Sequence, residues 1–438
     1  MPGAERTWVP GADGSGFGIE HLPYGVVRRA GEAPWVAVRI GDQALDLAAL
    51  ADSGLLAVPG LSARLLRAPA LNAFLELGRS VWSATRARVV ELLDARGAAA
   101  GDVGRALVPV AAVEAMLPVA VGDYVDFYSS LEHATNLGRI MRPGTEPLLP
   151  NWRHLPVAYH GRAGSIVVSG TPIRRPCGQR GPGSAGLSEG PWEGLSEGLS
   201  EGPSEGPSFG PERQLDFELE LGFVTGGGVA PGAPIPAGAA REHIFGVLLV
   251  NDWSAREIQR WEAQPLGPFL GKSFATSVGA WITPLEALAA HRLPGVPQDP
   301  PPLPYLRTDE PWAFDIELEV AIMPAGSRAE LTVTRTNASE LYWNAAQQLA
   351  HATSGGAFAR AGDLFASGTI SGPEPGSYGS LIELTWGGSR AISLDGATRT
   401  FLEDGDTVVM RGVAAGGAGR PRLELGEVRG LVLAAGAS

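Results

Sequence analysis

The first part of the chain consists of short apolar segments separated by turn residues. Residues 24–27 and 35–40 have the β-branched and aromatic composition of strands, and a Gly-Asp pair follows the second segment. Between residues 71 and 93, apolar positions recur at helical spacing, with a glycine at position 97 beyond the end. We therefore expect residues 1–118 to form a small barrel of short strands, against which one amphipathic helix packs.

The apolar segments become longer from residue 119 onward, so we place a domain boundary near Pro118. Residues 214–224 alternate strictly between polar and apolar side chains, which predicts a strand with two unlike faces. Residues 244–250 form a continuous apolar run, which is typical of a strand buried on both faces. We expect this larger domain, residues 119–438, to carry the chemistry.

Residues 181–212 interrupt the larger domain with repeated Ser-Glu-Gly units. This composition offers few side chains that a core could bury, so we predict a disordered surface insertion. A charged tether is the functional alternative, and a tolerated loop is favoured over it. The single cysteine, Cys177, lies just before this segment; it rules out an intramolecular disulfide and is expected to be an ordinary loop residue.

Composition narrows both the fold and the partners. The 60 glycines and 36 prolines suit short strands joined by tight turns, which predicts a mostly β fold. The net charge of −13 disfavours binding to nucleic acid or to an anionic membrane surface. The first residues lack the apolar core of a signal peptide, and nowhere do about 18 apolar residues run together, so we expect a cytoplasmic protein that does not span a membrane.

Three acidic side chains share one face of the predicted strand at 214–224, namely Asp216, Glu218 and Glu220. Neighbouring glutamates repel each other unless a positive group lies between them, so these residues mark a candidate cation site. A solvated strand face explains them equally well. Residues 314–320 repeat the same pattern, so alternation alone does not identify a site.

The sequence after residues 244–250 distinguishes the first acidic strand from the second. The Ser-Ala-Arg-Glu run at 254–257 has the spacing of a capping box, which predicts the start of a helix. On that helix Asp252, Arg256 and Gln259 would face one direction. Lys272 follows after a short loop. Carboxylates followed closely by these basic and amide groups suggest a metal site beside an oxyanion pocket.

A further acid, Asp126, lies upstream in a segment that also holds His133. Carboxylates without clustered histidine or cysteine favour a hard cation such as Ca²⁺ or Mg²⁺ over zinc. Because a short run ties His133 to a candidate metal ligand, it is the leading candidate for a general base, with His160 as the alternative.

Several long segments resemble the signature blocks of the fumarylacetoacetate hydrolase family, in the family's order. They read DYVDFYSSLEHATNLGRIMRPGTEPLLPNWRHLPVAYHGRAGSIVVSGTPIRRPCGQ, LDFELELGF, HIFGVLLVNDWSAREIQRWE, PLGPFLGKSFATS and GDLFASGTISGPEP. The resemblance covers most of residues 17–412. It implies an N-terminal SH3-like barrel, a C-terminal β-roll domain peculiar to this family, and a homodimer.

The resemblance also implies roles for individual residues. The matched metal ligands are Asp126, Glu218, Glu220 and Asp252, with Lys272 and Thr276 at a second, structural cation near Asp252. The matched catalytic residues are the general base His133, the acid Glu383 that orients it, and the oxyanion and carbanion donors Arg256, Gln259 and Lys272. The matched substrate-binding residues are Tyr128, Arg142, Tyr159, Gln259 and Thr369. One position departs, because Ala263 stands where the family has tyrosine, which leaves the tolerated acyl group open.

The reaction that the resemblance implies is metal-dependent hydrolysis of the carbon–carbon bond in a 1,3-diketo acid. The substrate would be 4-fumarylacetoacetate, the products fumarate and acetoacetate, and the pathway tyrosine breakdown, of which this is the last step. Two alternatives stay open. One is another reaction on the same scaffold, such as acylpyruvate hydrolysis, decarboxylation of a 2-oxo acid or hydration of a dienoate. The other is a non-enzymatic β module whose acids hold a structural calcium ion.

Overall fold

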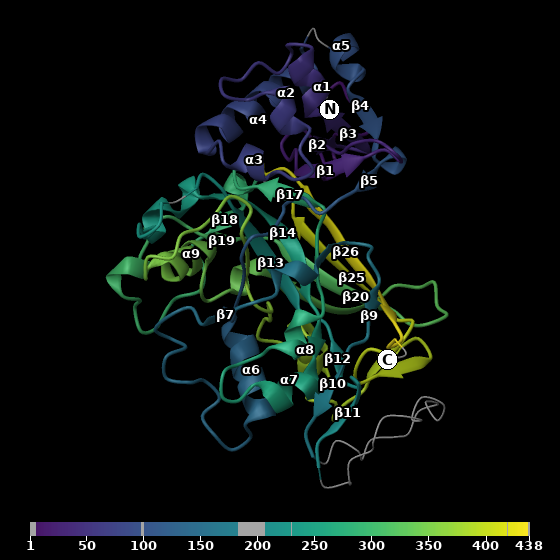
Figure 1. Cartoon of the computed structure of the whole chain (residues 1–438), viewed down its shortest axis with the longest axis vertical. Coiled ribbons are helices and arrows are strands. Elements are labelled where there is room, and N and C mark those ends of the chain that lie inside the picture. The colour runs from purple at the N-terminus through teal and green to yellow at the C-terminus, as the bar shows by residue number, and fades with distance from the viewer. Residues whose placement is uncertain (1–5, 98–99, 183–205, 229, 418, 437–438) are drawn as a thin grey trace.

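Strands make up most of the regular structure in this computed structural model, which describes residues 6–97, 100–182, 206–228, 230–417 and 419–436. The mostly β fold expected from composition is confirmed. The largest sheet has 13 strands and a second sheet has five. The N-terminal elements sit above the rest of the molecule, and the five-stranded sheet runs along one side (Figure 1).

The N-terminal strands form one edge of the 13-stranded sheet, in the antiparallel order β4-β3-β2-β1, with β5 also paired to β1. Their bounds are β1 (Tyr24–Arg28), β2 (Trp35–Ile40), β3 (Gln43–Asp46), β4 (Leu107–Pro109) and β5 (Glu114–Ala115). The strands predicted at 24–27 and 35–40 are therefore confirmed. Among the residues described here the strands do not close into a barrel, so the expected SH3-like barrel is not confirmed.

The N-terminal helices correct one prediction. In place of a single helix over 71–93, the chain forms α3 (Asn72–Leu75) and α4 (Arg79–Leu93), separated at Gly78. Gly78 has a φ of +79°, a left-handed conformation that glycine adopts without strain and that stops helix propagation. The remaining helices are α1 (Leu47–Asp52), α2 (Ala63–Leu66) and α5 (Ala100–Gly104).

The sheet continues from β1 into the larger part of the chain through β17, where Tyr24 pairs with Ile282. From there the order is β17-β14-β13-β22-β6-β7, and β14 also pairs with β16, which lies parallel to β8. The bounds are β6 (Tyr124–Phe127), β7 (Ala158–His160), β8 (Ile166–Val168), β13 (Leu219–Thr225), β14 (Ile244–Asp252), β16 (Thr276–Val278), β17 (Trp281–Pro284) and β22 (Leu364–Ala366). The sheet is thus continuous across Pro118, and the boundary placed there stays a prediction.

The second sheet has the order β21-β20-β25-β26-β9. Its strands are β9 (Ile173–Arg174), β20 (Glu317–Met323), β21 (Leu331–Asn337), β25 (Thr407–Ala414) and β26 (Leu423–Leu433). Four further pairs are β10 (Cys177–Arg180) with β11 (Ser208–Pro211), β12 (Leu215–Asp216) with β15 (Ser254–Ala255), β18 (Arg292–Leu293) with β19 (Ala313–Phe314), and β23 (Ile392–Leu394) with β24 (Ala397–Arg399). The helices here are α6 (Leu131–Met141), α7 (Arg256–Glu262), α8 (Leu270–Ser273), α9 (Ala345–Thr353) and α10 (Leu381–Leu384).

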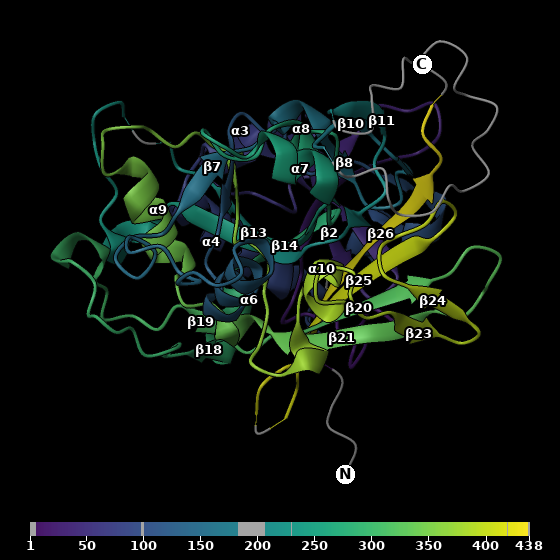
Figure 2. The ribbon, with the colours of Figure 1, turned by 90° about the horizontal axis from the view of Figure 1, so that it is seen from below.

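The helices α6, α7, α8 and α10 gather around one end of β13 and β14, as the view from below shows (Figure 2). The strand β14 coincides with the apolar run at 244–250 and is buried along its whole length, as predicted. The alternating segment at 214–224 is divided, because β12 ends at Asp216 and β13 begins at Leu219. Its acidic face is buried too, which excludes the interpretation as a solvated strand face.

The predicted insertion at 181–212 needs a correction at its C-terminal end. Residues 183–205 lie outside the described residues, but Ser208–Pro211 form β11, which pairs with β10. Cys177 is the first residue of β10 and half-buried, so it is not a loop residue. The ordered hairpin keeps the two ends of the insertion together, since Arg180 pairs directly with Ser208.

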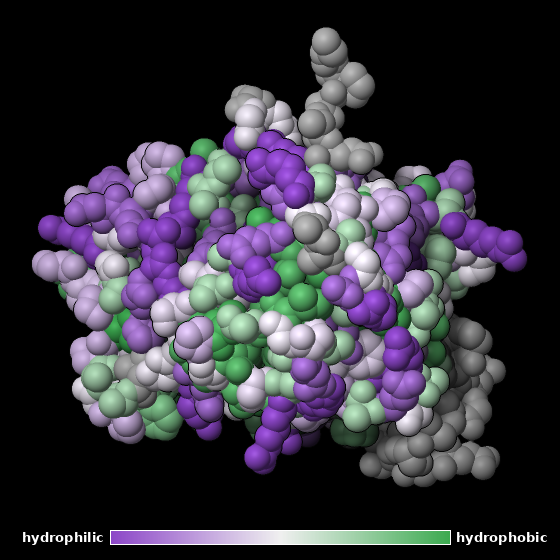
Figure 3. Space-filling view, turned by 90° about the horizontal axis from the view of Figure 1, so that it is seen from above, coloured by the Kyte–Doolittle hydropathy of each residue, from purple (hydrophilic) through white to green (hydrophobic). Residues whose placement is uncertain are grey.

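Apolar side chains fill the space between the N-terminal elements and the central sheet. One cluster joins N-terminal residues such as Val26 and Phe74 to Phe245 and Val250 of β14. On the outer face formed by the N-terminal elements, apolar side chains gather near the middle and polar ones lie around them (Figure 3). In the described part of the chain, no helix is both long and apolar enough to span a membrane.

Candidate active site

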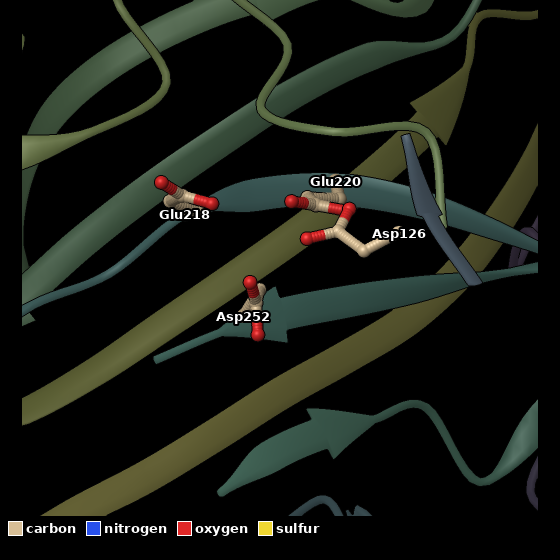
Figure 4. Close-up of side chains that lie close together, drawn as sticks. All are labelled: Asp126, Glu218, Glu220 and Asp252. Carbon is tan, nitrogen blue, oxygen red and sulfur yellow. The ribbon is translucent and has the colours of Figure 1, made fainter. Parts of the chain in front are cut away.

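Four buried carboxylates meet within the 13-stranded sheet, near the start of β13 and the end of β14. Each of Asp126, Glu218, Glu220 and Asp252 places an oxygen within 4.8 Å of the others. Asp126 lies on β6, Glu220 on β13 and Asp252 at the end of β14, while Glu218 directly precedes β13. Their carboxylates surround a common space (Figure 4). All four matched metal ligands are therefore brought together.

The cluster is short of positive charge on one side. Burial raises the pKa of Asp126 well above its ordinary value, and the charge of Asp252 adds to this. Burial likewise raises the pKa of Glu220, together with the charges of Asp126 and Asp252. In the part of the chain that the structure describes, the buried Oδ1 atom of Asp126 and Oε1 atom of Glu220 have no hydrogen-bond partner. Unpaired carboxylate oxygens beside like charges fit a bound divalent cation.

Two basic residues neutralise the other side of the cluster. Lys272 on α8 donates to Asp252 Oδ2 at 2.6 Å and also to Glu218. The Nη1 atom of Arg256 lies 2.8 Å from Glu218 Oε1. Although burial alone would raise it, these two charges hold the pKa of Glu218 below its ordinary value. Glu218 is thus ionised, and each of its oxygens has a basic partner, unlike the oxygens of Glu220.

Asp252 has two further partners. The Tyr159 hydroxyl on β7 donates to its Oδ2 at 3.2 Å, and the Thr276 hydroxyl on β16 donates to its Oδ1, also at 3.2 Å. Both contacts follow from strand register, because Thr276 pairs with Asp252 and Tyr159 pairs with Asp126. Tyr159 and Thr276 therefore lie at the cluster, as the matched positions require.

A buried histidine–carboxylate pair lies beside the carboxylates. His133 Nδ1 is 2.6 Å from Glu383 Oε2, and the two residues are 250 positions apart in the chain. Burial alone would raise the pKa of Glu383, but the neighbouring His133 and its hydrogen bonds hold it below the ordinary value. Because Glu383 fixes Nδ1, the histidine presents Nε2 as its free nitrogen. His160, the alternative base, is exposed on β7.

The backbone at Gly368 approaches the cluster closely. Its N–H donates to Glu220 Oε2 at 3.1 Å. Gly368 has a φ of +77°, and a Cβ atom there would lie 2.2 Å from the Phe127 carbonyl oxygen, so another residue would not fit. Thr369 follows it directly, and among the described residues its buried hydroxyl has no hydrogen-bond partner.

Of the other three matched substrate-binding residues, Tyr128 contacts the histidine, while Gln259 and Arg142 have other partners. The ring of Tyr128 packs edge-on against His133, with 5.3 Å between ring centroids. Gln259 on α7 accepts a hydrogen bond from Arg256 Nη1 at 3.1 Å. Arg142 ends α6 and is exposed, with Nη2 donating to the Pro147 carbonyl at 2.7 Å. Arg142 therefore lies at the protein surface, and among the described residues its hydrogen bond goes to Pro147 and not to the carboxylates.

The start of α7 differs from the prediction in two ways. Asp252 belongs to β14, so it does not share a helix face with Arg256 and Gln259. The predicted capping box is also wrong, because Ser254 donates to the Asp252 carbonyl instead of accepting from the helix. Glu212, which precedes β12, accepts from the N–H groups at residues 257 and 258, at 3.2 and 3.1 Å. A carboxylate distant in sequence replaces the local cap.

The look-alike strand at residues 314–320 makes surface ion pairs instead of a site. Glu317 is exposed. Glu319 pairs with Arg335 Nη2 at 2.5 Å and lies 3.8 Å from Arg411 Nη1. The two acidic strands thus differ in what packs over them, which alternation does not reveal.

Sequence reasoning missed the groups that hold Glu383. Its Oε2 accepts from Ser371 Oγ at 2.9 Å and Ser380 Oγ at 2.6 Å, and its Oε1 accepts from Asn136 Nδ2 at 3.1 Å. Asp216 shares the acidic strand face that marks the candidate cation site, but it lies outside the four-carboxylate cluster. It contacts Arg256 and α10 instead. Asn136, Ser371 and Asp216 lie in the family-like blocks, whereas Ser380 lies outside them.

Known proteins resemble the chain over nearly its whole length. A family model described as "Fumarylacetoacetase N-terminal" matches residues 20–118, and one described as "Fumarylacetoacetate (FAA) hydrolase C-terminal" matches residues 124–430. Fumarylacetoacetase from Bos taurus is 46% identical over 437 residues, covering 98% of this chain and 99% of the relative. The enzyme from Oryza sativa subsp. japonica is 46% identical over 421 residues, covering 94% of each.

Solved structures agree on the fold. A fumarylacetoacetate hydrolase from Exiguobacterium antarcticum superposes with a TM-score of 0.52 at 15% identity, covering 94% of this chain and 99% of its own. At that identity the likeness concerns the fold alone. The two family matches and the relatives together show the family: the chain belongs to the fumarylacetoacetate hydrolase family.

Proposed function

We propose that the chain hydrolyses the carbon–carbon bond of 4-fumarylacetoacetate to give fumarate and acetoacetate, the last step of tyrosine degradation. Relatives of 45–46% identity over nearly full length, all fumarylacetoacetases, support this activity. The observation that carries it is the His133–Glu383 pair beside four carboxylates and two basic groups. A structural ion alone needs neither a base nor oxyanion donors, which disfavours the non-enzymatic alternative.

The cluster would hold Ca²⁺ or Mg²⁺ through Asp126, Glu218, Glu220 and Asp252. All four offer hard oxygen atoms, and two of these oxygens have no other partner. A second cation near Asp252 would involve Lys272 and Thr276. The charges of Asp252 and Glu218 outweigh burial and raise the pKa of Lys272, so its ammonium stays protonated and has no lone pair to give. Lys272 would therefore reach such a cation through its backbone carbonyl.

A bound cation would supply Lewis-acid polarisation of the substrate's carbonyl groups. His133 would take a proton from water at Nε2, while Glu383 accepts a hydrogen bond from its Nδ1–H group and so fixes the tautomer and the ring plane. The resulting hydroxide would attack the carbonyl carbon of the fumaroyl half. When the carbon–carbon bond breaks, its electron pair goes to the acetoacetate carbon, and the proton held by His133 completes that product.

Arg256, Gln259 and Lys272 would stabilise the negatively charged oxygen of the tetrahedral intermediate by donating hydrogen bonds to it. An ammonium has three N–H groups, and Lys272 uses two of them on Asp252 and Glu218, which leaves one to donate. Gln259 accepts from Arg256 through Oε1, so its amide NH₂ is free. Each such donor contributes about 3 kcal/mol of transition-state stabilisation.

The assay that tests this function follows the loss of fumarylacetoacetate with and without a chelator. We expect chelation to abolish turnover and Ca²⁺ or Mg²⁺ to restore it. Full turnover after confirmed metal removal would contradict the role of the cation. An acylpyruvate, a 2-oxo acid and a dienoate belong in the same panel, because Ala263 stands where the family has tyrosine and removes a phenol from the site wall. Faster turnover of one of these would favour the corresponding alternative.

The finer assignments rest on the family resemblance and on the sequence patterns. We propose an SH3-like barrel over residues 1–118, a family-type β-roll over 119–438, a homodimer and a cytoplasmic location. Sedimentation of the purified chain tests the dimer directly, since a monomer at assay concentrations would contradict it.

A further inference from the structure

Asp216 is a buried carboxylate that the reaction outlined above does not use. Its Oδ2 atom accepts from Arg256 Nε at 2.8 Å and from the Ile382 N–H at 3.0 Å. Its Oδ1 atom accepts from the Leu381 N–H at 2.7 Å and from the Phe217 N–H at 2.8 Å. Asp216 is fully buried, so these four donors, and not water, define its position.

The helix α10 depends on Asp216 for its first N–H groups. The N-cap residue Ser380 makes no capping hydrogen bond, because its hydroxyl donates to Glu383 Oε2 at 2.6 Å. Asp216 accepts the N–H groups of Leu381 and Ile382 in its place. Glu383 is the third residue of this four-residue helix, and it holds His133. Asp216 therefore fixes the element that orients the base.

The same carboxylate fixes the guanidinium of Arg256, which is the first residue of α7. Nε bonds to Asp216, which turns Nη1 toward Glu218 Oε1 at 2.8 Å and Gln259 Oε1 at 3.1 Å. Without this anchor, the guanidinium could rotate about its long side chain and lose its alignment with the carboxylates. Asp216 thus contacts both the segment of the base and the segment of the oxyanion donors.

We propose that Asp216 is a positioning residue that holds the His133–Glu383 pair and Arg256 at a fixed distance and orientation for the reaction. It acts through these residues and touches neither substrate nor cation. Hydroxide formed at His133 must attack a carbonyl whose oxygen then points at the donors, so both groups have to be placed relative to the same carbon. The inference rests on the proposed function for its assay.

The test is a double-mutant cycle with fumarylacetoacetate as substrate and saturating Mg²⁺. Asp216→Asn keeps the shape but puts an NH₂ group against a donor, so we expect kcat to fall about a hundredfold, while KM changes far less. In an Arg256→Gln background, which already lacks the guanidinium, the same change should cost much less. The same reduction is expected in a Glu383→Gln background, because part of the effect passes through Glu383.

Asp406 offers a matched control. It is also fully buried, accepts Arg399 Nε and Nη2 at 2.8 and 2.9 Å, and accepts the N–H groups of Ala325 and Glu403. Asp406→Asn should lower the melting temperature as Asp216→Asn does, without the loss of kcat. Should Asp216→Asn yield too little folded protein, Asp216→Glu keeps the charge, moves the carboxylate by one methylene and enters the same cycle.

The outcomes separate the two proposals. A folded Asp216 variant with wild-type kcat, or one whose loss is equally large in all three backgrounds, overturns the positioning role. An equal loss of kcat in Asp406→Asn also overturns it, because general destabilisation would then explain the effect. Wild-type protein that does not cleave fumarylacetoacetate contradicts the proposed function itself, before any variant is compared.

Discussion

The buried side chains of the site carry more negative than positive charge, which the core of a protein does not normally tolerate. Four carboxylates face one another, and Lys272 is the one cation among the described residues that bonds to cluster carboxylates alone. Arg256 is shared between Glu218 and Asp216. Burying unpaired charge costs several kcal/mol per ion. The cluster therefore costs stability, and a bound cation would offset that cost.

His133 is the residue whose loss should separate the base from the ligands. We expect His133→Ala to lower kcat by about two to four powers of ten, because a general base contributes that range. Cation affinity should survive, since the four clustered oxygens remain. Glu383→Gln should give a milder loss, because the histidine remains but is less well oriented. Turnover and calorimetric cation titration of both variants provide the measurement.

The result for His133→Ala has a clear contrary outcome. Wild-type turnover, or cation affinity that falls in step with turnover, would mean that His133 is not the base. The exposed His160 would then be the next residue to replace.

Two strands with the same sequence pattern, β13 and β20, differ in the surroundings of their acidic residues. The strands β13 and β20 carry the same alternation of acidic and apolar residues, yet Glu220 is buried in a carboxylate cluster and Glu319 pairs with arginines near the surface. What differs is the neighbouring strand. β13 lies between β14 and β22, while β20 lies between β21 and β25.

Exchanging one glutamate for glutamine in each strand tests this difference. Without cation, Glu220→Gln should unfold at the same or a higher temperature than wild type, because one repelling charge is gone. Added Ca²⁺ should then stabilise wild type, by about 2.7 kcal/mol at a hundred times its Kd, but stabilise Glu220→Gln much less. Glu319→Gln should respond to Ca²⁺ as wild type does. Equal cation responses in the two variants, measured by thermal unfolding, would show that the site was assigned to the wrong strand.

The hairpin β10–β11 gives a test of the Ser-Glu-Gly insertion. A Cβ atom at Gly178 would lie 2.5 Å from Ile258 Cδ1, so the hairpin packs directly on α7. Removing residues 183–205 joins Pro182 to Gly206 and preserves the pairing of Arg180 with Ser208. Turnover should stay nearly unchanged, because loop length alters free energy by only about 0.6 kcal/mol per doubling. A large fall in kcat or in folding yield would show that the insertion supports the site.

Glu212 provides the contrast to this deletion. Glu212→Ala leaves the N–H groups at the start of α7 without their acceptor, which should cost about 1–2 kcal/mol of stability. Turnover should fall as well, because Arg256 and Gln259 both lie on this helix. If Glu212→Ala keeps wild-type stability and turnover, as the deletion is expected to do, then Glu212 does not position α7.

Local patterns predicted the elements that depend on local burial and failed where distant residues decide. The strand at 35–40 and the apolar run of β14 were both found, because their side chains follow the spacing of a strand. The break at Gly78 and the cap of α7 were missed. The cap comes from Glu212, 45 residues from the N–H group it binds. The pairing of His133 with Glu383 spans 250 residues and came only from the family resemblance.

At the scale of the whole molecule, aromatic side chains join the N-terminal elements to the catalytic sheet. Phe245 of β14 packs edge-on against Tyr24, Phe74 and Trp82, with ring centroids 5.3, 5.9 and 5.2 Å away. The strands β1 and β17 hydrogen-bond to each other at the same interface, between the N-terminal elements and the larger part of the chain. The N-terminal residues are thus part of the structure that supports β14, which ends at Asp252.

His21 lies at this interface, and it should make the free energy of unfolding depend on pH. It is fully buried, with Nδ1 2.8 Å from the Gly16 carbonyl and Nε2 2.8 Å from the Thr283 hydroxyl. The pKa of His21 is lowered from 6.5 to about 3, mainly by burial. The hydrogen bond to the Gly16 carbonyl opposes this shift, and the charges of Arg86 and Arg39 add to it. The folded protein therefore holds His21 neutral, while the unfolded chain binds a proton below about pH 6.5.

The sign of the effect follows from this difference in proton binding. The contribution of His21 is fully present above about pH 6.5 and is lost as the pH falls toward 3, at up to about 1.4 kcal/mol per pH unit. Between pH 6.5 and pH 5, a window in which most carboxylates stay ionised, the loss amounts to about 2 kcal/mol. His21→Gln keeps a donor and an acceptor but does not titrate, so its unfolding free energy should fall less steeply over this window. Denaturant unfolding at several pH values measures both slopes, with the exposed His154→Gln as a control that should follow wild type. If the unfolding free energies of wild type and His21→Gln changed equally with pH, then the interface would open enough at acidic pH for His21 to take up a proton while the protein stays folded.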